Sequence, residues 1–294
     1  MELNHGTGWI PDVPKPNDYC ERHPDVVALL RKTKLLARVD AAAAAPPPSI
    51  NLREWFSPVE DQGKLGSCTA CAAVGLLEYF ERRTKKSFVN ASPLFLYKVT
   101  RNLMNRTGDT GATQRATMEA LALFGTPPES YWPYDGAPPE TNVHFDAEPT
   151  AFQYALAKNY QALTYFRLDP DATTPAQVLN NVKAYLAGGF PVMFGFPAYT
   201  DFVTPLSDAQ SKGLVAFPGP QSTYKGGHAI VAAGYDDARM IGNDQGALLV
   251  RNSWGEDWGD AGYGWMSYRY VTEGYADDWW TMISARWVDT NAFA

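Results

Sequence analysis

A cysteine at the expected start of an apolar helix is the residue of this 294-residue sequence that most directly suggests chemistry. Gly66 and Ser67 form a turn-like pair just before Cys68, and an apolar run over residues 69–80 follows it. The unpaired N–H groups and the positive dipole end of a helix N-terminus favour a thiolate over a thiol. A thiolate is the nucleophilic form of cysteine, so Cys68 is a candidate nucleophile if the chain also supplies a base.

His228 is the histidine whose surroundings best suit such a base. It follows Gly226 and Gly227 and opens a strand-like apolar run over residues 229–235. The two glycines permit close backbone approach, and a strand would hold the ring rigidly. An imidazole beside a thiol can take its proton and form an ion pair. The remaining histidines lie in the N-terminal segment or in a polar stretch without distinctive context, and they are His5, His23 and His144.

An asparagine and a glutamine have side chains that could complete the set. The carbonyl of Asn252 can accept a hydrogen bond from an imidazole N–H and orient the ring, and Trp254 could shield that bond from water. Gln62 stands six residues before Cys68. Its amide and the backbone N–H of Cys68 could together stabilise an oxyanion, and losing one such donor typically lowers the rate by about 10²–10³.

Three separate motifs, in this order along the chain, resemble those of the papain-like cysteine peptidase family. The resemblance covers about residues 50–285 and implies an α+β fold of two lobes with a cleft between them. The helical lobe would carry the nucleophile helix, and an antiparallel, barrel-like lobe would carry the histidine and the asparagine. No metal or organic cofactor is implied. The motifs are Gln62 with Gly66-Ser67-Cys68, then Gly227-His228-Ala229, then Asn252-Ser253-Trp254-Gly255.

The resemblance also implies roles for individual residues. Cys68 would be the nucleophile of an endopeptidase, and His228 would be its base and acid. Asn252 would orient the histidine, and Gln62 would hold the oxyanion. Small residues would line the second specificity subsite, so this subsite would suit a bulky apolar side chain of a peptide or protein substrate. The residues expected to bind substrate are Gly66, Gly111, Ala112, Ala229, Trp254 and Trp258.

Three other functions compete with peptidase activity. Cys68 and Cys71 form a C-x-x-C pair at a helix start, as in thiol redox proteins, but no βαβ unit flanks them. Acyl transferases and transglutaminase-like enzymes use a similar triad. They would differ from a peptidase because an amine would outcompete water in attacking the acyl-enzyme. A non-catalytic binding protein on this fold usually lacks a member of the triad, and this sequence has them all.

The composition limits the classes of partner that the protein could bind and the cellular compartment in which it could work. The net charge of −7 argues against nucleic acid and against an anionic membrane surface. Three cysteines, among them Cys20, allow at most one intramolecular disulfide, so there is no disulfide framework. The N-terminus lacks the basic start and apolar core of a secretory signal. These features favour a cytoplasmic peptidase.

The order of the expected elements supports two lobes. Helices are expected over 69–84, 113–124 and 171–188, and strands follow over 191–196, 229–235, 247–251 and 264–268. Helices first and antiparallel-type strands later indicate an α+β protein. We expect a body over residues 49–294, with a helical lobe over about 49–150 and a β-rich lobe over about 151–294.

Residues 1–48 differ from this body and read as an N-terminal extension. Prolines make residues 8–17 extended, and a short helix with one apolar face opens at Pro24. The alanine and proline run over residues 40–49 is expected to be a tether. In this respect the sequence resembles bacterial members of the family that have short N-terminal extensions. We expect the extension to lie across the cleft as an intramolecular inhibitor.

Overall fold

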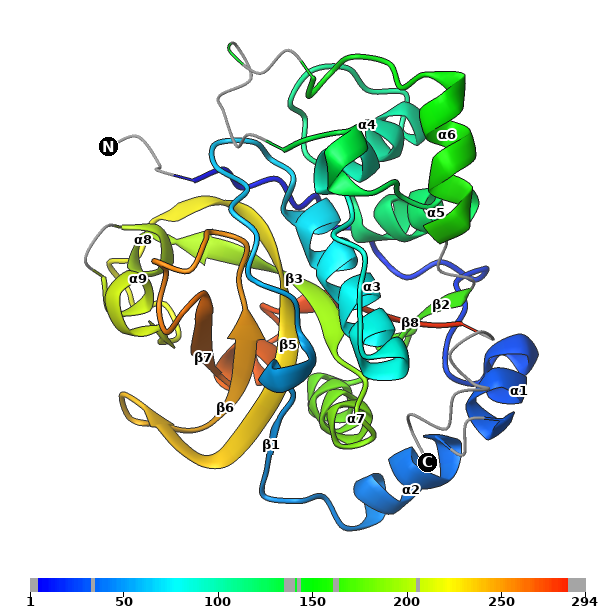
Figure 1. Ribbon diagram of the computed structural model, residues 1–294. Coiled ribbons are helices and arrows are strands. Elements are labelled where there is room, and N and C mark those ends of the chain that lie inside the picture. Colours follow the sequence, from blue (N-terminus) through cyan, green and yellow to red (C-terminus); the bar gives the residue numbers. More distant parts are fainter. Residues whose placement is uncertain are drawn as a thin grey trace.

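The computed structural model is an α+β protein in which a group of helices packs beside one large sheet (Figure 1). It describes residues 5–32, 35–134, 141, 144–160, 164–204 and 207–284. The α-helices are α1 (Pro24–Lys32), α2 (Leu35–Ala44), α3 (Cys68–Lys85), α4 (Pro93–Leu103), α5 (Gln114–Phe124), α6 (Ala151–Ala157), α7 (Pro175–Ala187), α8 (Thr200–Val203), α9 (Asp208–Lys212) and α10 (Arg269–Thr272). Short 3₁₀ turns occur at Arg53–Trp55, Glu129–Tyr131 and Lys158–Tyr160.

The sheet joins all the strands of the described chain and is open rather than a closed barrel. Its order is β2-β8-β3-β5-β6-β7-β4, with β1 pairing to β5. The pairs are antiparallel except β4 with β7. The strands are β1 (Ser49–Asn51), β2 (Thr164–Arg167), β3 (Val192–Tyr199), β4 (Leu214–Val215), β5 (Tyr224–Ile241), β6 (Asp244–Arg251), β7 (Tyr263–Ser267) and β8 (Asp277–Ile283).

Helix α3 lies between the helical group and the sheet, where Figure 1 shows it in cyan. Residues 68–81 are all buried, because one side of α3 packs against α4 and α5 and the other against β5 and β3. The helix ends at Lys86, which adopts the left-handed conformation common after a helix. Its first turn has no side-chain cap from Ser67, so backbone N–H groups remain available beside Cys68.

The histidine and the asparagine of the motifs stand on adjacent strands of the sheet. His228 lies within β5 and pairs with Phe196 of β3, whereas Asn252 follows the last residue of β6. Antiparallel pairing of β5 with β6 brings Val231 opposite Arg251. The sheet therefore carries both residues toward the N-terminal end of α3.

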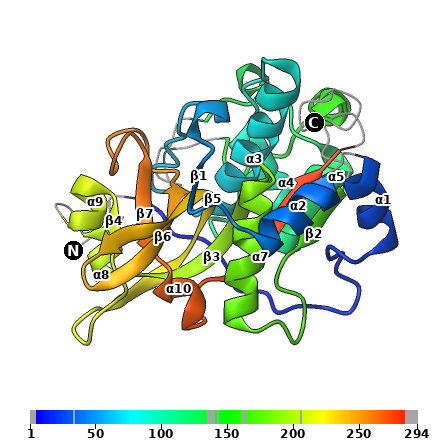
Figure 2. The ribbon, with the colours of Figure 1, turned by 90° about the horizontal axis from the view of Figure 1, so that it is seen from below.

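Residues 35–44 correct one expectation from the sequence. The run of alanines after Asp40 does not form a tether, because residues 40–44 complete helix α2. Alanine has the highest intrinsic helix propensity, and Val39 and Ala42 are buried. Helix α2 packs against α7, as Figure 2 shows from below.

None of the helices in the described ranges combines the length and the apolar character that a membrane span requires.

Candidate active site

Cys68 begins α3 and is completely buried. Burial raises the pKa of its thiol to about 11, although backbone hydrogen bonds from Ala229 and from Gly8 act in the opposite direction. The helix N-terminus therefore does not produce a thiolate in this state, since loss of water around the sulfur outweighs the dipole. Trp9 packs directly on Cys68 and Ala229. The nucleophile of the sequence prediction is covered by the chain's own N-terminal segment.

His228 is held by the asparagine that the sequence pairs with it. Its Nε2 lies 2.8 Å from Oδ1 of Asn252, and that oxygen also accepts from the backbone N–H of Ser253. The Nδ1 atom is buried and has no hydrogen-bond partner among the described residues. Burial lowers the pKa of His228 to about 4, so the ring is neutral near pH 7.

Aromatic side chains enclose the imidazole. The ring of Trp254 lies 4.8 Å from it between centroids, and Phe202 and Phe196 lie 5.6 and 5.8 Å away. Trp254 also stacks on His5, with centroids 5.1 Å apart and planes at 12°. The pair His228–Asn252 is thus shielded from water by Trp254, and Trp254 is in turn covered by the N-terminal segment.

Gln62 is buried beside the cysteine turn with its side chain fixed at both ends. Its Oε1 accepts from the hydroxyl of Ser253 at 2.6 Å. Its Nε2 donates to the carbonyl of Leu65 at 2.8 Å and to that of Gly6 at 3.1 Å. The amide hydrogen that Gly6 accepts is one that an attacked carbonyl could use, so the segment occupies this donor.

The N-terminal segment lies along the cleft and bonds to both of its walls through the main chain. Backbone N–H groups donate from Ala112 to the Gly8 carbonyl at 2.8 Å and from Ile10 to the Ala112 carbonyl at 3.0 Å. On the opposite wall, the Trp9 N–H donates to the Gly227 carbonyl at 3.0 Å. Main-chain bonds to both walls are how an extended peptide binds in a groove. Residues 5–10 therefore occupy the groove between Cys68 and the sheet.

Glycines allow this close approach. A Cβ atom on Gly8 would overlap the carbonyl of Gly66, and one on Gly111 would overlap the carbonyl of Gly8. Gly111 also has a φ of +69°, which favours glycine. A Cβ on Gly227 would overlap the carbonyl of Trp9. The groove thus fits a main chain without side chains at these points.

Comparison with known proteins identifies the relationship that this geometry suggests. The model of the papain family of cysteine proteases matches residues 46–278. The chain belongs to the papain family. It is a cysteine peptidase, a hydrolase of peptide bonds, and the comparisons favour neither an acyl transferase nor a redox protein.

Relatives of this papain-family chain come from a virus, a protist and a bacterium. An uncharacterised peptidase C1-like protein of Acanthamoeba polyphaga mimivirus is 34% identical over 224 residues, covering 75% of this chain and 68% of that protein. A cathepsin B-like protein of Giardia intestinalis is 28% identical over 293 residues, covering 89% and 86%. The crystal structure of xylellain, a cysteine protease from Xylella fastidiosa, aligns with a TM-score of 0.77 and 30% identity, covering 97% of this chain and 98% of that one.

The structure brings most of the expected substrate-binding residues to the groove. Gly66, Gly111 and Ala112 lie along one wall, and Ala229 lies on the other beside Cys68. Trp258 differs from the expectation. It is fully buried and packs edge-on behind Trp254 with centroids 6.5 Å apart, so it supports that ring instead of facing the groove.

Several residues that shape the groove have no local motif. Asp109 accepts from the backbone N–H of Gly66 at 2.9 Å and from the hydroxyl of Tyr97 at 2.6 Å. Asp278 of β8 accepts a hydrogen bond from the indole N–H of Trp9, which is 269 residues away in sequence. A buried carboxylate such as that of Asp278 needs donors, but the sequence alone does not say which loop or strand supplies them.

The two other cysteines take no part in the groove. Cys71 is fully buried within α3, and its Sγ lies 3.9 Å from the hydroxyl of Ser67. Cys20 pairs through its backbone with Arg167 of β2. All three cysteines are free thiols, so the structure has no Cys68–Cys71 disulfide. In the described part of the chain, no group of three His, Cys, Asp or Glu side chains could hold a metal ion.

Proposed function

We propose that Cys68, His228, Asn252 and Gln62 are the catalytic residues of this peptidase and that residues 5–10 hold it latent. The observation that carries the proposal is the backbone of Gly8 and Trp9 lying on Cys68 while Gly6 takes the Gln62 amide. Residues 1–48 are, in this proposal, a regulatory extension, and peptides or proteins are the substrates.

Catalysis starts once the segment leaves. Water then reaches the thiol and the imidazole, and the proton moves from Cys68 to His228, because solvation and the helix N-terminus stabilise the ion pair. The thiolate attacks the peptide carbonyl, and Gln62 with the Cys68 N–H stabilises the oxyanion. Protonated His228 gives its proton to the leaving amine and then activates water to hydrolyse the acyl-enzyme.

Asn252 keeps the imidazole in the orientation that this proton transfer needs. Its carbonyl accepts from Nε2 at 2.8 Å, which leaves Nδ1 as the atom for exchange with the thiol. The backbone N–H of Ser253 fixes the same carbonyl, so the amide cannot turn without losing that bond. The tautomer and the ring plane are therefore set before substrate binds.

A closed groove accounts for latency in electrostatic terms. In the covered state the thiol pKa of about 11 and the imidazole pKa of about 4 leave both groups neutral. A neutral thiol is a weak nucleophile at pH 7. The segment thus blocks substrate sterically and also keeps the pair from ionising.

The test is hydrolysis of a dipeptidyl fluorogenic substrate by three proteins. These are the full chain, a variant lacking residues 1–11 that keeps α1 and α2, and the same truncation with Cys68→Ala. We expect the truncation to raise kcat/KM at least about tenfold, and Cys68→Ala to remove the activity. If the truncation leaves kcat/KM unchanged while its circular dichroism remains native, the latency proposal is wrong. Activity that survives Cys68→Ala would overturn the assignment of the nucleophile.

A further inference from the structure

The hydroxyl of Tyr134 lies between the two residues that carry or flank the oxyanion donors. Its oxygen is 2.7 Å from the main-chain carbonyl oxygen of Gln62 and 2.6 Å from Oγ of Ser67. Gln62 supplies one donor through its side-chain amide, and Ser67 directly precedes Cys68, whose backbone N–H is the other. One hydroxyl group therefore links the two ends of the loop over residues 62–67 that separates the donors.

The direction of each hydrogen bond follows from the chemistry of the groups. A carbonyl oxygen can only accept, so the single proton of the Tyr134 hydroxyl goes to Gln62. The Ser67 hydroxyl must then donate to the tyrosine oxygen. Burial raises the pKa of Tyr134 well above its usual value, so the phenol keeps its proton. The Sγ of Cys71, 3.9 Å from Oγ of Ser67, is a weak partner that does not compete with this link.

Ser67 gives up a more usual role to make this contact. It stands at the N-cap position of α3, where a serine side chain normally accepts from an N–H group of the first turn. Its hydroxyl instead points to Tyr134, and it caps none of the N–H groups in the described first turn. The turn therefore has no serine oxygen at the N–H groups beside Cys68 that an oxyanion would use.

Tyr134 is itself fixed by the helical side of the molecule. Its backbone N–H donates to the carboxylate of Glu129, and its ring packs against the hydrophobic core. Gln62 is held from the opposite side, because its backbone N–H donates to the carbonyl of Ser253, just after β6, at 2.9 Å. The loop that carries the oxyanion donors is thus bonded to both sides of the molecule, and Tyr134 makes the bond from the helical side.

We propose that Tyr134 is a positioning residue for the oxyanion site: by joining Gln62 to Ser67, its hydroxyl keeps the Gln62 amide and the Cys68 N–H at the separation that one oxyanion needs. Such donors act at about 2.7–3.1 Å from the developing charge, and losing one lowers the rate by about 10²–10³. A loosened loop should cost part of that factor. The inference rests on the proposed function, which assigns the oxyanion to these two donors.

The test compares two reactions of Cys68 in the full chain. Hydrolysis of a dipeptidyl fluorogenic substrate passes through an oxyanion. Alkylation by iodoacetamide, followed by mass spectrometry, does not, because the sulfur bonds to carbon and iodide leaves. Both reactions require that the N-terminal segment leave the groove, so the ratio of kcat/KM to the alkylation rate does not depend on the covered fraction.

We expect Tyr134→Phe to lower this ratio about tenfold, because the two donors no longer fit the oxyanion well. The loss should appear in kcat, with KM within about threefold, since a displaced donor weakens the transition state more than substrate binding. The alkylation rate should stay within about twofold of the wild-type rate, because no oxyanion forms in that reaction.

The matched control is Tyr79→Phe. The Tyr79 hydroxyl also donates to a backbone carbonyl, that of Gly189 at 2.8 Å, and accepts from Nη1 of Arg83 at 2.6 Å. It is equally a buried tyrosine, but it lies 11 residues (79 − 68), or about 16 Å, along α3 from Cys68. Its loss should leave the ratio within about twofold, because it touches neither oxyanion donor.

Ser67→Ala removes the other half of the link and tests the same inference in a second variant. It should also lower the ratio, because the tyrosine then holds only Gln62. If the link acts as one unit, the double variant of Tyr134→Phe with Ser67→Ala should lose no more than about twofold beyond Tyr134→Phe alone.

Three outcomes would overturn the inference. The first is a ratio for Tyr134→Phe that equals the ratio for Tyr79→Phe. The second is a loss of hydrolysis and alkylation by the same factor, which would mean that the hydroxyl supports the cysteine and not the oxyanion donors. The third is full multiplication of the two single losses in the double variant. Failure of the proposed function looks different, because hydrolysis would then persist in Cys68→Ala.

Discussion

Residues 5–10 and residues 12–18 follow each other along the N-terminal segment, yet different forces hold them to the body. Residues 5–10 bind by main-chain hydrogen bonds, by glycine-to-glycine contact and by one indole. Their binding desolvates Cys68 and His228 and leaves both without charge. Residues 12–18, in contrast, bind through charged side chains.

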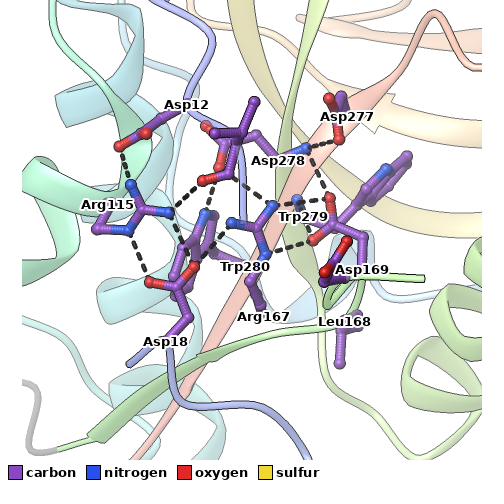
Figure 3. A network of polar contacts seen from close by, with 12 residues as sticks. Asp12, Asp18, Arg115, Arg167, Leu168, Asp169, Asp277, Asp278, Trp279 and Trp280 are labelled. Carbon is purple, nitrogen blue, oxygen red and sulfur yellow. Dashed lines mark hydrogen bonds and ion pairs between the residues drawn. The ribbon is translucent and has the colours of Figure 1, made fainter. Parts of the chain in front are cut away.

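The charged contact is a network of arginines and carboxylates (Figure 3). Arg115 of α5 bonds to Asp12 and to both oxygens of Asp18, and the Asp18 contacts are 2.7 and 2.8 Å long. Arg167 of β2 reaches Asp18 at 3.0 Å and forms a two-point ion pair with Asp169, also at 3.0 Å. The extension thus supplies the partners that buried guanidinium groups require.

The contrast separates two tasks of one segment. The groove contact closes the active site, because it removes water from groups whose reactivity depends on ionisation. The charged contact anchors the chain, because it satisfies arginines that would otherwise be buried without full pairing. If this division is right, changes in the groove should alter the chemistry of Cys68, whereas changes in the anchor should alter only how often the groove is covered.

The largest expected effect distinguishes the catalytic role of Gln62 from its contact with the N-terminal segment. Gln62→Ala should lower kcat by about 10²–10³, because it removes one oxyanion donor. Of the three hydrogen bonds that the Gln62 side chain makes, only the one to Gly6 joins it to the N-terminal segment, and that bond is worth about 1 kcal/mol. Steady-state kinetics on the chain lacking residues 1–11 measures the first effect without the second. A kcat within threefold of the parent would contradict the assigned role of Gln62.

Gly8→Val should open the groove. The new side chain would overlap the Gly66 carbonyl, and such overpacking costs about 1–3 kcal/mol. The open fraction, and with it kcat/KM of the full chain, should rise about 5–150-fold. Val13→Ala is the matched control, since Val13 is 72% exposed and outside the groove. Unchanged activity in Gly8→Val would show that this contact does not limit access.

Asp18→Asn should weaken the anchor and raise kcat/KM about tenfold. Burial alone would raise the pKa of Asp18, but hydrogen bonds from Arg115 and Arg167 outweigh it and lower the pKa below 3.8. A lowered carboxylate pKa stabilises the docked state above pH 3.8, and this stabilisation is lost as the pH falls through the lowered value. The anchor should therefore hold at pH 5 and loosen only in stronger acid, as measured by Cys68 alkylation against pH.

The control for the anchor is Asp25→Asn, because Asp25 is an exposed residue of α1 whose ion-pair contact with His23 is 3.8 Å long. It should leave kcat/KM unchanged, since exposed pairs contribute about 0–1 kcal/mol. Equal activation by both substitutions would mean that net charge, and not the buried network, controls docking.

Cys71→Ala should have the smallest effect on chemistry. The side chain is buried in α3, so its loss should lower the free energy of unfolding by about 1–2 kcal/mol and leave kcat within about twofold. Thermal unfolding and kinetics of the truncated chain check the two parts. A large loss of kcat would favour a redox role for the Cys68–Cys71 pair.

Local patterns account for what the sequence predicted well. The helices expected over 69–84 and 113–124 correspond to α3 and α5, and the later strands correspond to β3, β5, β6 and β7. His228 and Asn252 could be paired from their motifs, because each motif contains its own turn or strand context. The structure places them 2.8 Å apart.

Long-range contacts account for what the sequence missed. The alanine run reads as a tether from composition, but it becomes helical because α7 offers a surface to Val39 and Ala42. The contact between Asp278 and Trp9 could not be predicted, because the two residues lie 269 positions apart in sequence.

The most direct test of the account is the pH dependence of Cys68 alkylation in the full chain and in full-length Gly8→Val. The account predicts that wild-type alkylation is slow at neutral pH, because burial keeps the covered thiol protonated and only the small open fraction reacts. In Gly8→Val the reaction should be fast at neutral pH and remain so into the acid range, as for a thiolate paired with an imidazolium. A fast, acid-extending profile in both proteins would contradict the claim that the N-terminal segment keeps the cysteine unionised.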